Sequence, residues 1–342
     1  MSLADRKNYM EQCTRCSQCK FVPMPKSKDF SSICPSIDYG HFHAYCGGGK
    51  VVTAYGYLHE KIEASPGMID SVYACTMCGA CDTACKTHFG DNVEPFDTLL
   101  ELRARMAKDG KVPPALKGIV ENLTSEGAPG GKRADRSKWT EGLEITDARE
   151  HSVDVLLHVG SNNAYDAAQW DHLRLMTRLF GAAGVDFGIL YDSESDSGGI
   201  AYELGYREVA ASLAGELKSQ LTKCKASVLL AADAESYSAF KDIYPRLGVS
   251  LDTVRILHTT EYIDELITSG KLSLALENDI KVALHDSCRL GRRSETFEPW
   301  EGSWIRVLNT MAVPDSPRPV RFGNHGNYET PRRLLSRIQG LE

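Results

Sequence analysis

The chain has 342 residues, a formal net charge of -7 and an apolar content of 42%. This length and apolar content suffice for more than one domain with a buried core. The negative charge argues against nucleic acid as a partner. The first residues lack the apolar run of a signal peptide, and no stretch reaches the length of a membrane-spanning helix, so we expect a soluble, cytoplasmic protein.

The 11 cysteines are concentrated near the N-terminus, where nine of them precede residue 86. Tight groups of cysteines in a chain without an export signal are typical of metal ligation in a reducing compartment rather than of disulfides. Apolar residues are sparse in residues 1–111, so bound clusters would supply much of the stability that a hydrophobic core supplies elsewhere. We therefore predict a metal-dependent domain over residues 1–111.

Two motifs of the form CxxCxxC lie in this domain, and each can place three thiolates around one iron-sulfur cube. In two-cluster ferredoxins a distal cysteine reaches across to the cluster that the other motif holds. The predicted ligands of the first cluster are Cys13, Cys16, Cys19 and Cys85. The predicted ligands of the second cluster are Cys75, Cys78, Cys81 and Cys34. The pattern thus predicts two 4Fe-4S clusters.

The distal ligand of the second cluster has two candidates, Cys34 and Cys46. Pro35 follows Cys34, and a proline commonly follows the distal cysteine of a ferredoxin motif, which favours Cys34. Structural zinc is the main alternative to iron and sulfide. Zinc motifs generally pair CxxC groups, however, whereas here three cysteines run through one loop.

The segment CGGGK, residues 46–50, is only partly similar to a phosphate-binding loop. Ala44 stands where GxxxxGK[ST] requires its first glycine, and Val51 stands where a Ser or Thr would bind magnesium. We interpret the segment as a glycine turn that packs against a cluster.

A helix is predicted after the second motif. Pro95 suits its first turn, Phe96 and Leu99 fall near one face, and Gly110 ends it. Residues 112–150 then lack sustained periodicity and contain stretches rich in proline and glycine. They are predicted to be a linker or a surface wrap between domains.

Residues 151–342 alternate between strand-like and helix-like patterns, which predicts a parallel sheet with crossover helices. The strand patterns lie at 153–160, 185–191 and 226–232, and the helical patterns lie at 170–184 and 206–224. Residues 155–165 are similar to residues 282–292. We therefore predict two pseudo-repeated α/β units, the second of them cut short.

His285, Asp286 and Cys288 follow the strand predicted for the second unit. Strand ends of an open α/β sheet face the ligand crevice, so these side chains could bind a metal or activate a thiolate. Such a set is more often structural than catalytic, and Cys288 and His285 are only weak catalytic candidates. Cys224, at a predicted helix end, is expected to be an inert core thiol.

Together these features resemble the iron-sulfur subunits of the heterodisulfide reductase and glycolate oxidase type. In that family a two-cluster ferredoxin domain precedes two cysteine-rich CCG repeats, which in catalytic members hold a noncubane iron-sulfur cluster that cleaves disulfides. The resemblance is specific in the cysteine motifs, and in the second half the segment from His285 to Arg292 carries it. It implies a mainly helical ferredoxin domain followed by α/β repeats with parallel sheets.

The repeats of this chain have lost nearly all of the family's cysteines. In the first repeat Ser161 stands at the leading cysteine, residues 196–198 (DSG) at the CCG, and residues 233–236 at the CxxC. The second repeat keeps Cys288 but has residues 321–323 (RFG) at its CCG. Because iron-sulfur clusters need thiolates, we expect the fold of the CCG domain without its catalytic cluster.

The favoured hypothesis is an electron-transfer subunit of a multi-subunit oxidoreductase, which relays single electrons to or from a flavoprotein or a heterodisulfide-reductase-like subunit. The chain has neither a GxGxxG fingerprint nor a recognisable substrate site, which favours work within a hetero-oligomeric complex. One alternative is a thiol or disulfide reductase with a remodelled site at Cys288, near His285 and His325. Another is a structural subunit whose clusters only hold the fold.

Overall fold

The structure is a computed structural model that describes residues 2–21, 31–89, 93–273, 279–308 and 311–341. The chain divides into two compact units. The first unit consists of Met1–Lys117, Ala201–Arg207 and Phe297–Asn324. The second unit consists of Gly118–Ile200, Glu208–Thr296 and His325–Glu342. The chain therefore leaves each unit and returns to it more than once.

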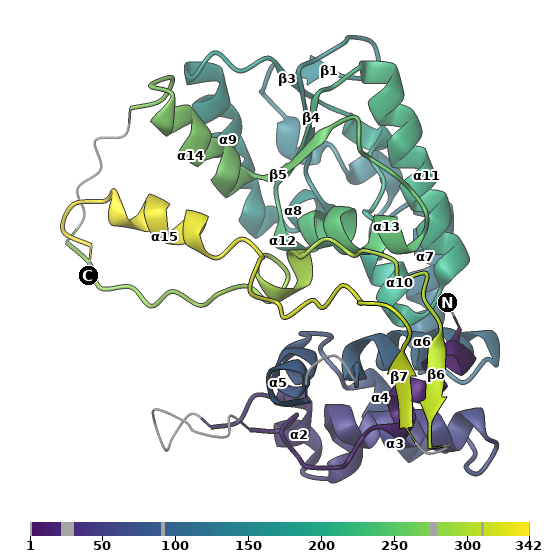
Figure 1. The fold of residues 1–342 in the computed structure, drawn as a ribbon. Helices are drawn as coiled ribbons and strands as arrows, with labels where there is room; N and C mark the ends of the chain where they lie inside the picture. The colour runs from purple at the N-terminus through teal and green to yellow at the C-terminus, as the bar shows by residue number, and fades with distance from the viewer. Residues whose placement is uncertain (1, 22–30, 90–92, 274–278, 309–310, 342) are drawn as a thin grey trace. The chain divides into compact units, whose positions relative to one another are not determined.

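The first unit is mainly helical (Figure 1). Its helices are α1 (Lys7–Glu11), α2 (Pro35–Gly40), α3 (Gly47–Leu58), α4 (Pro66–Tyr73), α5 (Ala80–Phe89) and α6 (Pro95–Lys108). Two late strands, β6 (Trp304–Val307) and β7 (Met311–Pro314), form an antiparallel hairpin in the same unit. The Tyr9 and Trp304 rings pack edge to face, with 4.8 Å between the ring centroids, so the hairpin contacts α1.

Helix α6 is the helix predicted after the second cysteine motif. It begins at Pro95, has an acidic residue in its first turn and basic residues in its last turn, and is followed by Gly110 in a left-handed conformation. Phe96, Leu99 and Leu100 are buried, so the predicted apolar face is the one that packs. Burial of each such side chain contributes about 1.5–3 kcal/mol.

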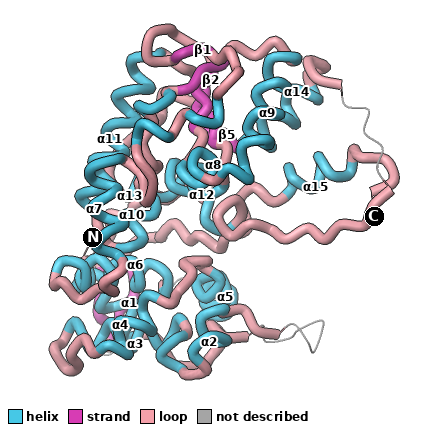
Figure 2. Tube along the Cα trace, turned by 180° about the vertical axis from the view of Figure 1, so that it is seen from behind, coloured by secondary structure: helices cyan, strands magenta, loops and turns pink. Residues whose placement is uncertain are grey.

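The second unit contains a five-stranded parallel sheet with the strand order β1-β3-β2-β4-β5. The strands are β1 (Thr146–Asp147), β2 (Val155–His158), β3 (Phe187–Ile189), β4 (Val228–Ala231) and β5 (Arg255–His258). The longer helices are α9 (Trp170–Ala182), α11 (Arg207–Cys224) and α14 (Thr259–Thr268). Helices α9 and α14 lie on one side of the sheet and α11 lies on the other (Figures 1 and 2).

Shorter helices lie wholly or partly in this unit. They are α7 (Leu116–Glu126), α8 (Ser161–Tyr165), α10 (Gly199–Leu204), α12 (Ala234–Ser238), α13 (Tyr244–Arg246) and α15 (Glu329–Ser336). Helices α7, α10 and α11 each begin in one unit and end in the other.

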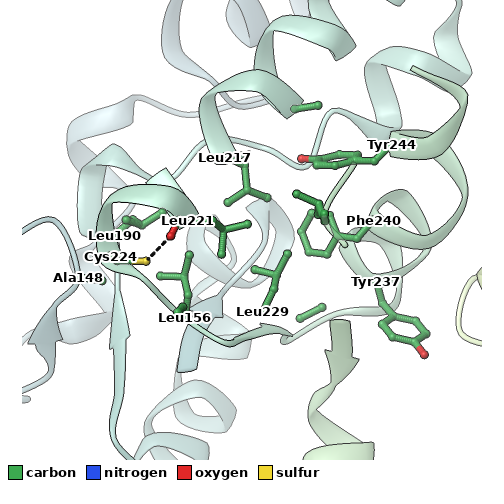
Figure 3. Packing of buried hydrophobic residues seen from close by; sticks show 14 of the residues in the cluster. Ala148, Leu156, Leu190, Leu217, Leu221, Cys224, Leu229, Tyr237, Phe240 and Tyr244 are labelled. Atoms are coloured by element: carbon green, nitrogen blue, oxygen red, sulfur yellow. Dashed lines mark hydrogen bonds between the residues drawn. The ribbon is translucent and has the colours of Figure 1, made fainter. Parts of the chain in front are cut away.

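Alternate residues of β2 supply two hydrophobic cores, one on each face of the sheet. Val155 and Leu157 belong to the cluster that includes Phe180 of α9. Leu156 belongs to the cluster with residues of α11, among them Leu217 (Figure 3). The predicted helical and parallel α/β classes are thus confirmed, because each face of the sheet buries a helix as crossover connections require.

Cys224 lies in the second of these cores, 1% exposed, and its thiol donates to the carbonyl oxygen of Leu221 at 3.5 Å (Figure 3). It has the environment of a small core residue, as predicted.

Residues 112–150 are not the linker that we expected. Trp139 is 2% exposed and packs in the core of β2 and α9. Arg136 is also buried, and strand β1 in the same stretch pairs with β3. Helix α7 (Leu116–Glu126) also lies in this stretch, and long-range contacts that local sequence patterns do not reveal hold Trp139 and Arg136.

The strand predicted over the start of residues 282–292 is not formed. Val282 and Leu284 are 44% and 45% exposed, whereas the corresponding residues of β2 are buried in the sheet. The described part of the second repeat therefore adds no strand to the parallel sheet. Residues 297–324, expected in the second domain, cluster with the first unit instead.

Candidate iron-sulfur centres

Two cavities in the first unit are lined by the predicted ligands. The first cavity, of about 410 Å³, is lined by Cys13, Cys16, Cys19 and Cys85. The second cavity, of about 400 Å³, is lined by Cys34, Cys75, Cys78 and Cys81. In each cavity three cysteines of one motif meet a fourth from a distant part of the sequence.

Left-handed backbone conformations bend the two motif loops around their cavities. Arg15 and Ser17 have φ of 60° and 72° in the first loop, and Met77 and Gly79 have φ of 56° and 74° in the second. Non-glycine residues seldom adopt this conformation, so two of them close together mark a tightly constrained loop. The constraint places successive cysteines of a motif around one cavity.

Helix α3 begins between the linings of the two cavities, at the glycines of the CGGGK segment. A Cβ atom on Gly47 would lie 2.6 Å from Cβ of Cys81, and one on Gly48 would lie 3.2 Å from Sγ of Cys19. The Gly48 N–H donates to that same sulfur at 3.2 Å. The glycines therefore pack against candidate ligands of both cavities, and they begin a helix where we had expected only a turn.

Cys46 caps helix α3 and is fully buried. Its sulfur accepts the N–H of Gly49 and lies 3.7 Å from Sγ of Cys19. Among the described residues that line the second cavity, the distal cysteine is Cys34 and not Cys46. This geometry favours Cys34, as does the proline that follows it.

Several of the candidate ligands have a pKa raised above the ordinary value for cysteine. Burial raises the pKa of Cys85 to about 12, with the Asp82 carboxylate adding to the effect. Burial also raises the pKa of Cys81 well above its ordinary range, and that of Cys13 and Cys34 in the same direction. Iron displaces such protons when it binds thiolates, so this donor set fits an iron-sulfur cluster.

Arg103 fixes the start of the second motif and was not identified from the sequence. Its guanidinium donates to the carbonyl oxygens of Val72, Tyr73 and Cys75 at 3.0, 3.2 and 2.9 Å. It thereby satisfies the last carbonyls of α4 and holds the backbone of the first ligand of the motif. The sequence feature that could have identified Arg103 is its position seven residues after Phe96, which places a charged residue on the apolar face of α6.

The positions of the lost cysteines in the first repeat come together at the carboxyl ends of the central strands. This is where an open parallel sheet with the β3-β2-β4 order has its ligand crevice. Ser161 donates to Asp196 at 2.7 Å, and Ser236 donates to Asp233 at 3.0 Å. Buried or half-buried polar side chains thus form hydrogen bonds with one another at the positions that the resemblance assigns to a cluster.

The second repeat places its candidate residues in an extended segment and a turn. His285 is exposed, and Asp286 forms an exposed ion pair with Arg332 at 2.7 Å. Cys288 is half-buried and accepts a hydrogen bond from Arg292 at 3.2 Å. Across the residues that the structure describes, no group of three or more His, Cys, Asp or Glu side chains is arranged to hold a single metal ion.

Comparison with known proteins places a 4Fe-4S dicluster domain at residues 9–89, a range that includes all eight cysteines that line the two cavities. That domain covers only the cysteine-rich part of the chain. No solved structure matches the chain significantly.

Three curated relatives extend the similarity beyond this domain. A probable membrane-anchored ferredoxin of Chromohalobacter salexigens is 28% identical over 84% of this chain and 45% of its own length. A probable iron-sulfur-binding oxidoreductase, FadF, of Bacillus subtilis is 28% identical over 67% of this chain and 33% of its own length. A dihydromethanophenazine:CoB--CoM heterodisulfide reductase subunit of Methanosarcina acetivorans is 26% identical over 85% of this chain and 71% of its own length.

The chain thus spans less than half the length of the first two relatives. In the described part of this chain, no helix combines the length and the apolar composition needed to cross a bilayer. Residues 9–89 thus match the 4Fe-4S dicluster domain, and the resemblance of the chain to iron-sulfur subunits of the heterodisulfide reductase type is confirmed.

Proposed function

We propose that this protein is an electron-transfer subunit that relays single electrons through two 4Fe-4S clusters, one in each cavity. The observation that carries the proposal is the sorting of eight cysteines into two sets of four. Pro95 lines both cavities, so clusters held there would be near neighbours. Electrons tunnel efficiently only over short distances, and this proximity suits a relay.

The chain's own residues would hold and tune the clusters. Cys16 is exposed, so the first cluster would have an edge near the surface for exchange with a partner. Cys75, Cys78 and Cys81 are less exposed, which suits an internal carrier. The Gly48 N–H at Cys19 would stabilise negative charge on that sulfur.

The partner would be a flavoprotein or a heterodisulfide-reductase-like subunit within a hetero-oligomeric complex. A flavin converts two-electron chemistry into the single-electron steps that such clusters accept. The names of the relatives, an iron-sulfur-binding oxidoreductase and a heterodisulfide reductase subunit, support this kind of assembly.

The deciding experiment mixes the anaerobically purified chain with a reduced flavoprotein and follows bleaching of the cluster absorbance. We expect the clusters to become reduced, and we expect little or no turnover by the isolated chain with heterodisulfides or 2-hydroxy acids. Rapid disulfide reduction by the chain alone, lost in Cys288→Ala, would replace the relay with a thiol reductase. If no physiological reductant can reduce the clusters, their role would be structural and the relay would be excluded.

The crossed assignment of the two distal cysteines, Cys85 to the first cluster and Cys34 to the second, gives a separate prediction. The wild-type protein should contain about eight irons and eight sulfides, because each 4Fe-4S cube takes four cysteines. Cys85→Ser should perturb the electron paramagnetic resonance signal of the first cluster, although Cys85 follows the second motif in the sequence. Cys34→Ser should perturb the second cluster.

Two buried cysteines provide matched controls for this test. Cys224 lies in the core of the second unit, so Cys224→Ser should leave the iron content unchanged. Cys46→Ser should also retain about eight irons. Loss of the second cluster in Cys46→Ser, with the cluster intact in Cys34→Ser, would reverse the choice of the distal ligand.

A further inference from the structure

Lys50, the last residue of the CGGGK segment, has an unusual environment for a lysine. It lies in the first turn of α3 and is 2% exposed. Its ammonium donates to the Ser36 hydroxyl at 2.7 Å and to the carbonyl oxygen of Tyr45. Both acceptors are neutral, so these contacts engage two of the three ammonium N–H groups without balancing the charge.

Two other buried cations of the first unit are balanced by carboxylates. Lys86 pairs with Asp82 at 2.6 Å, and Arg6 pairs with Glu94 at 2.6 Å. Within the described residues no carboxylate pairs with Lys50. An isolated buried charge is costly, and proteins tolerate it where another charge compensates it.

The second cavity is where the compensating charge would lie. Lys50 and Ser36 line this cavity together with Cys34. The carbonyl oxygen of Tyr45 that accepts from Lys50 is also 3.9 Å from Sγ of Cys34. The ammonium therefore lies beside a candidate cluster ligand, on the cavity side of α3.

Among the described residues that line the first cavity, no lysine or arginine is buried. Arg15 is charged, but it is exposed to water, which screens its field. A buried charge acts through a medium of lower dielectric constant and has a stronger effect at the same distance. The two cavities thus differ in their electrostatic potential.

We propose that Lys50 is the counter-charge of the second cluster and makes that cluster the electron acceptor of the pair, an inference that rests on the proposed relay. Four thiolates on an oxidised cube give a net charge of about -2, and reduction by one electron adds one more negative charge. The fixed cation stabilises the reduced form more than the oxidised form. One electron then passes from the reduced first cluster to the second, so that the first cluster becomes oxidised and the second becomes reduced. A reduced flavin on the partner then donates one electron to the first cluster and reduces it again.

The test is a redox titration, followed by electron paramagnetic resonance, of wild type, Lys50→Met and Lys50→Arg. The signals are assigned with the Cys85→Ser and Cys34→Ser variants. Lys50→Met should lower the equilibrium constant for reduction of the second cluster by about tenfold or more, which is ~59 mV for a one-electron couple. The potential of the first cluster should stay within the error of the titration.

Two variants separate the charge from other effects. Lys50→Arg keeps the charge and should keep most of the wild-type potential of the second cluster. Lys7→Met makes the same change in net charge at an exposed site, where the lysine pairs with Glu11, and should shift neither cluster.

An unchanged second potential in fully loaded Lys50→Met would overturn the inference. Loss of the second cluster in both Lys50→Met and Lys50→Arg would also overturn the inference, because the cluster would then depend on the shape of the lysine side chain and not on its charge. Loss of the second cluster in Lys50→Met but not in Lys50→Arg would support the role of Lys50 as a counter-charge. Failure of the relay itself would appear differently, as wild-type clusters that cannot be reduced.

Discussion

Removal of iron with a chelator is expected to unfold the cysteine-bearing part of the first unit while the parallel sheet of the second unit stays folded. The motif loops line two cavities that are partly open to solvent, and ligand bonds to a cluster would hold these loops in place. The second unit instead has two hydrophobic cores that need no metal. Hydrogen exchange should show loss of amide protection in α3 and α5, and retained protection in β2 and β4.

Reconstitution with iron and sulfide provides the control for this experiment, since it should restore protection in α3 and α5. Cys224→Ala should respond to the chelator as the wild type does, because this thiol lies in an apolar core. Equal protection of the first unit with and without iron would contradict the prediction and show that the helices support the loops unaided.

Glu194→Ala is expected to cost the second unit about 3–5 kcal/mol of unfolding free energy. Glu194 pairs with Arg136 at 2.6 Å, and both side chains are 2% exposed. Its carboxylate also accepts the N–H groups of Val159 and Gly160, directly after β2. Truncation would leave a buried guanidinium without its counter-charge and two buried amides without an acceptor. Urea unfolding, followed by hydrogen exchange of β2 peptides, would measure the loss.

An exposed ion pair of the same unit supplies the matched control. Arg255 and Glu265 also lie 2.6 Å apart, but their side chains are 62% and 46% exposed. Glu265→Ala should therefore cost no more than about 1 kcal/mol. Similar losses in the two variants would show that burial of the Glu194 pair has no energetic consequence.

The same carboxylate predicts a dependence of stability on pH. Burial opposes ionisation of Glu194, but His158, Arg136 and the N–H of Val159 outweigh it and lower the pKa of the carboxyl in the folded chain. The stabilisation is therefore fully present above the pKa of about 4.3 that an unfolded glutamate has, and it is lost as the pH falls through the lower folded value. Below that value the stability difference between wild type and Glu194→Gln should shrink.

The cysteine motifs and helix α6 could be predicted because their signals are local. Three cysteines in one loop constrain that loop whatever surrounds it, and a proline followed by an apolar face and a glycine defines a helix without long-range information. The central strands of the second unit were predictable for a similar reason, since Val155–His158 is apolar enough to be buried on both faces.

Other features depend on contacts between residues far apart in the sequence. Trp139 is ordered by a core formed from β2 and α9, so its own neighbours indicated only a linker. Residues 282–285 have the alternation of a strand, but no edge of the described sheet accepts them. The charges of Lys50 and Arg103 were visible in the sequence, whereas their burial was not.

The return of residues 297–324 to the first unit has a consequence for the order of events during synthesis. Glu94 is held by Arg318, which lies 224 residues later in the chain. At 5–20 residues per second a ribosome needs roughly 10–45 s to make that stretch. Until then the nascent first unit lacks its hairpin and the Arg318 cation of its buried charge network, although all eight candidate ligands have already emerged. Cluster-delivery proteins would thus meet the thiols before the unit is complete, and cluster loading after residues 297–324 have joined the unit is the order that this topology favours.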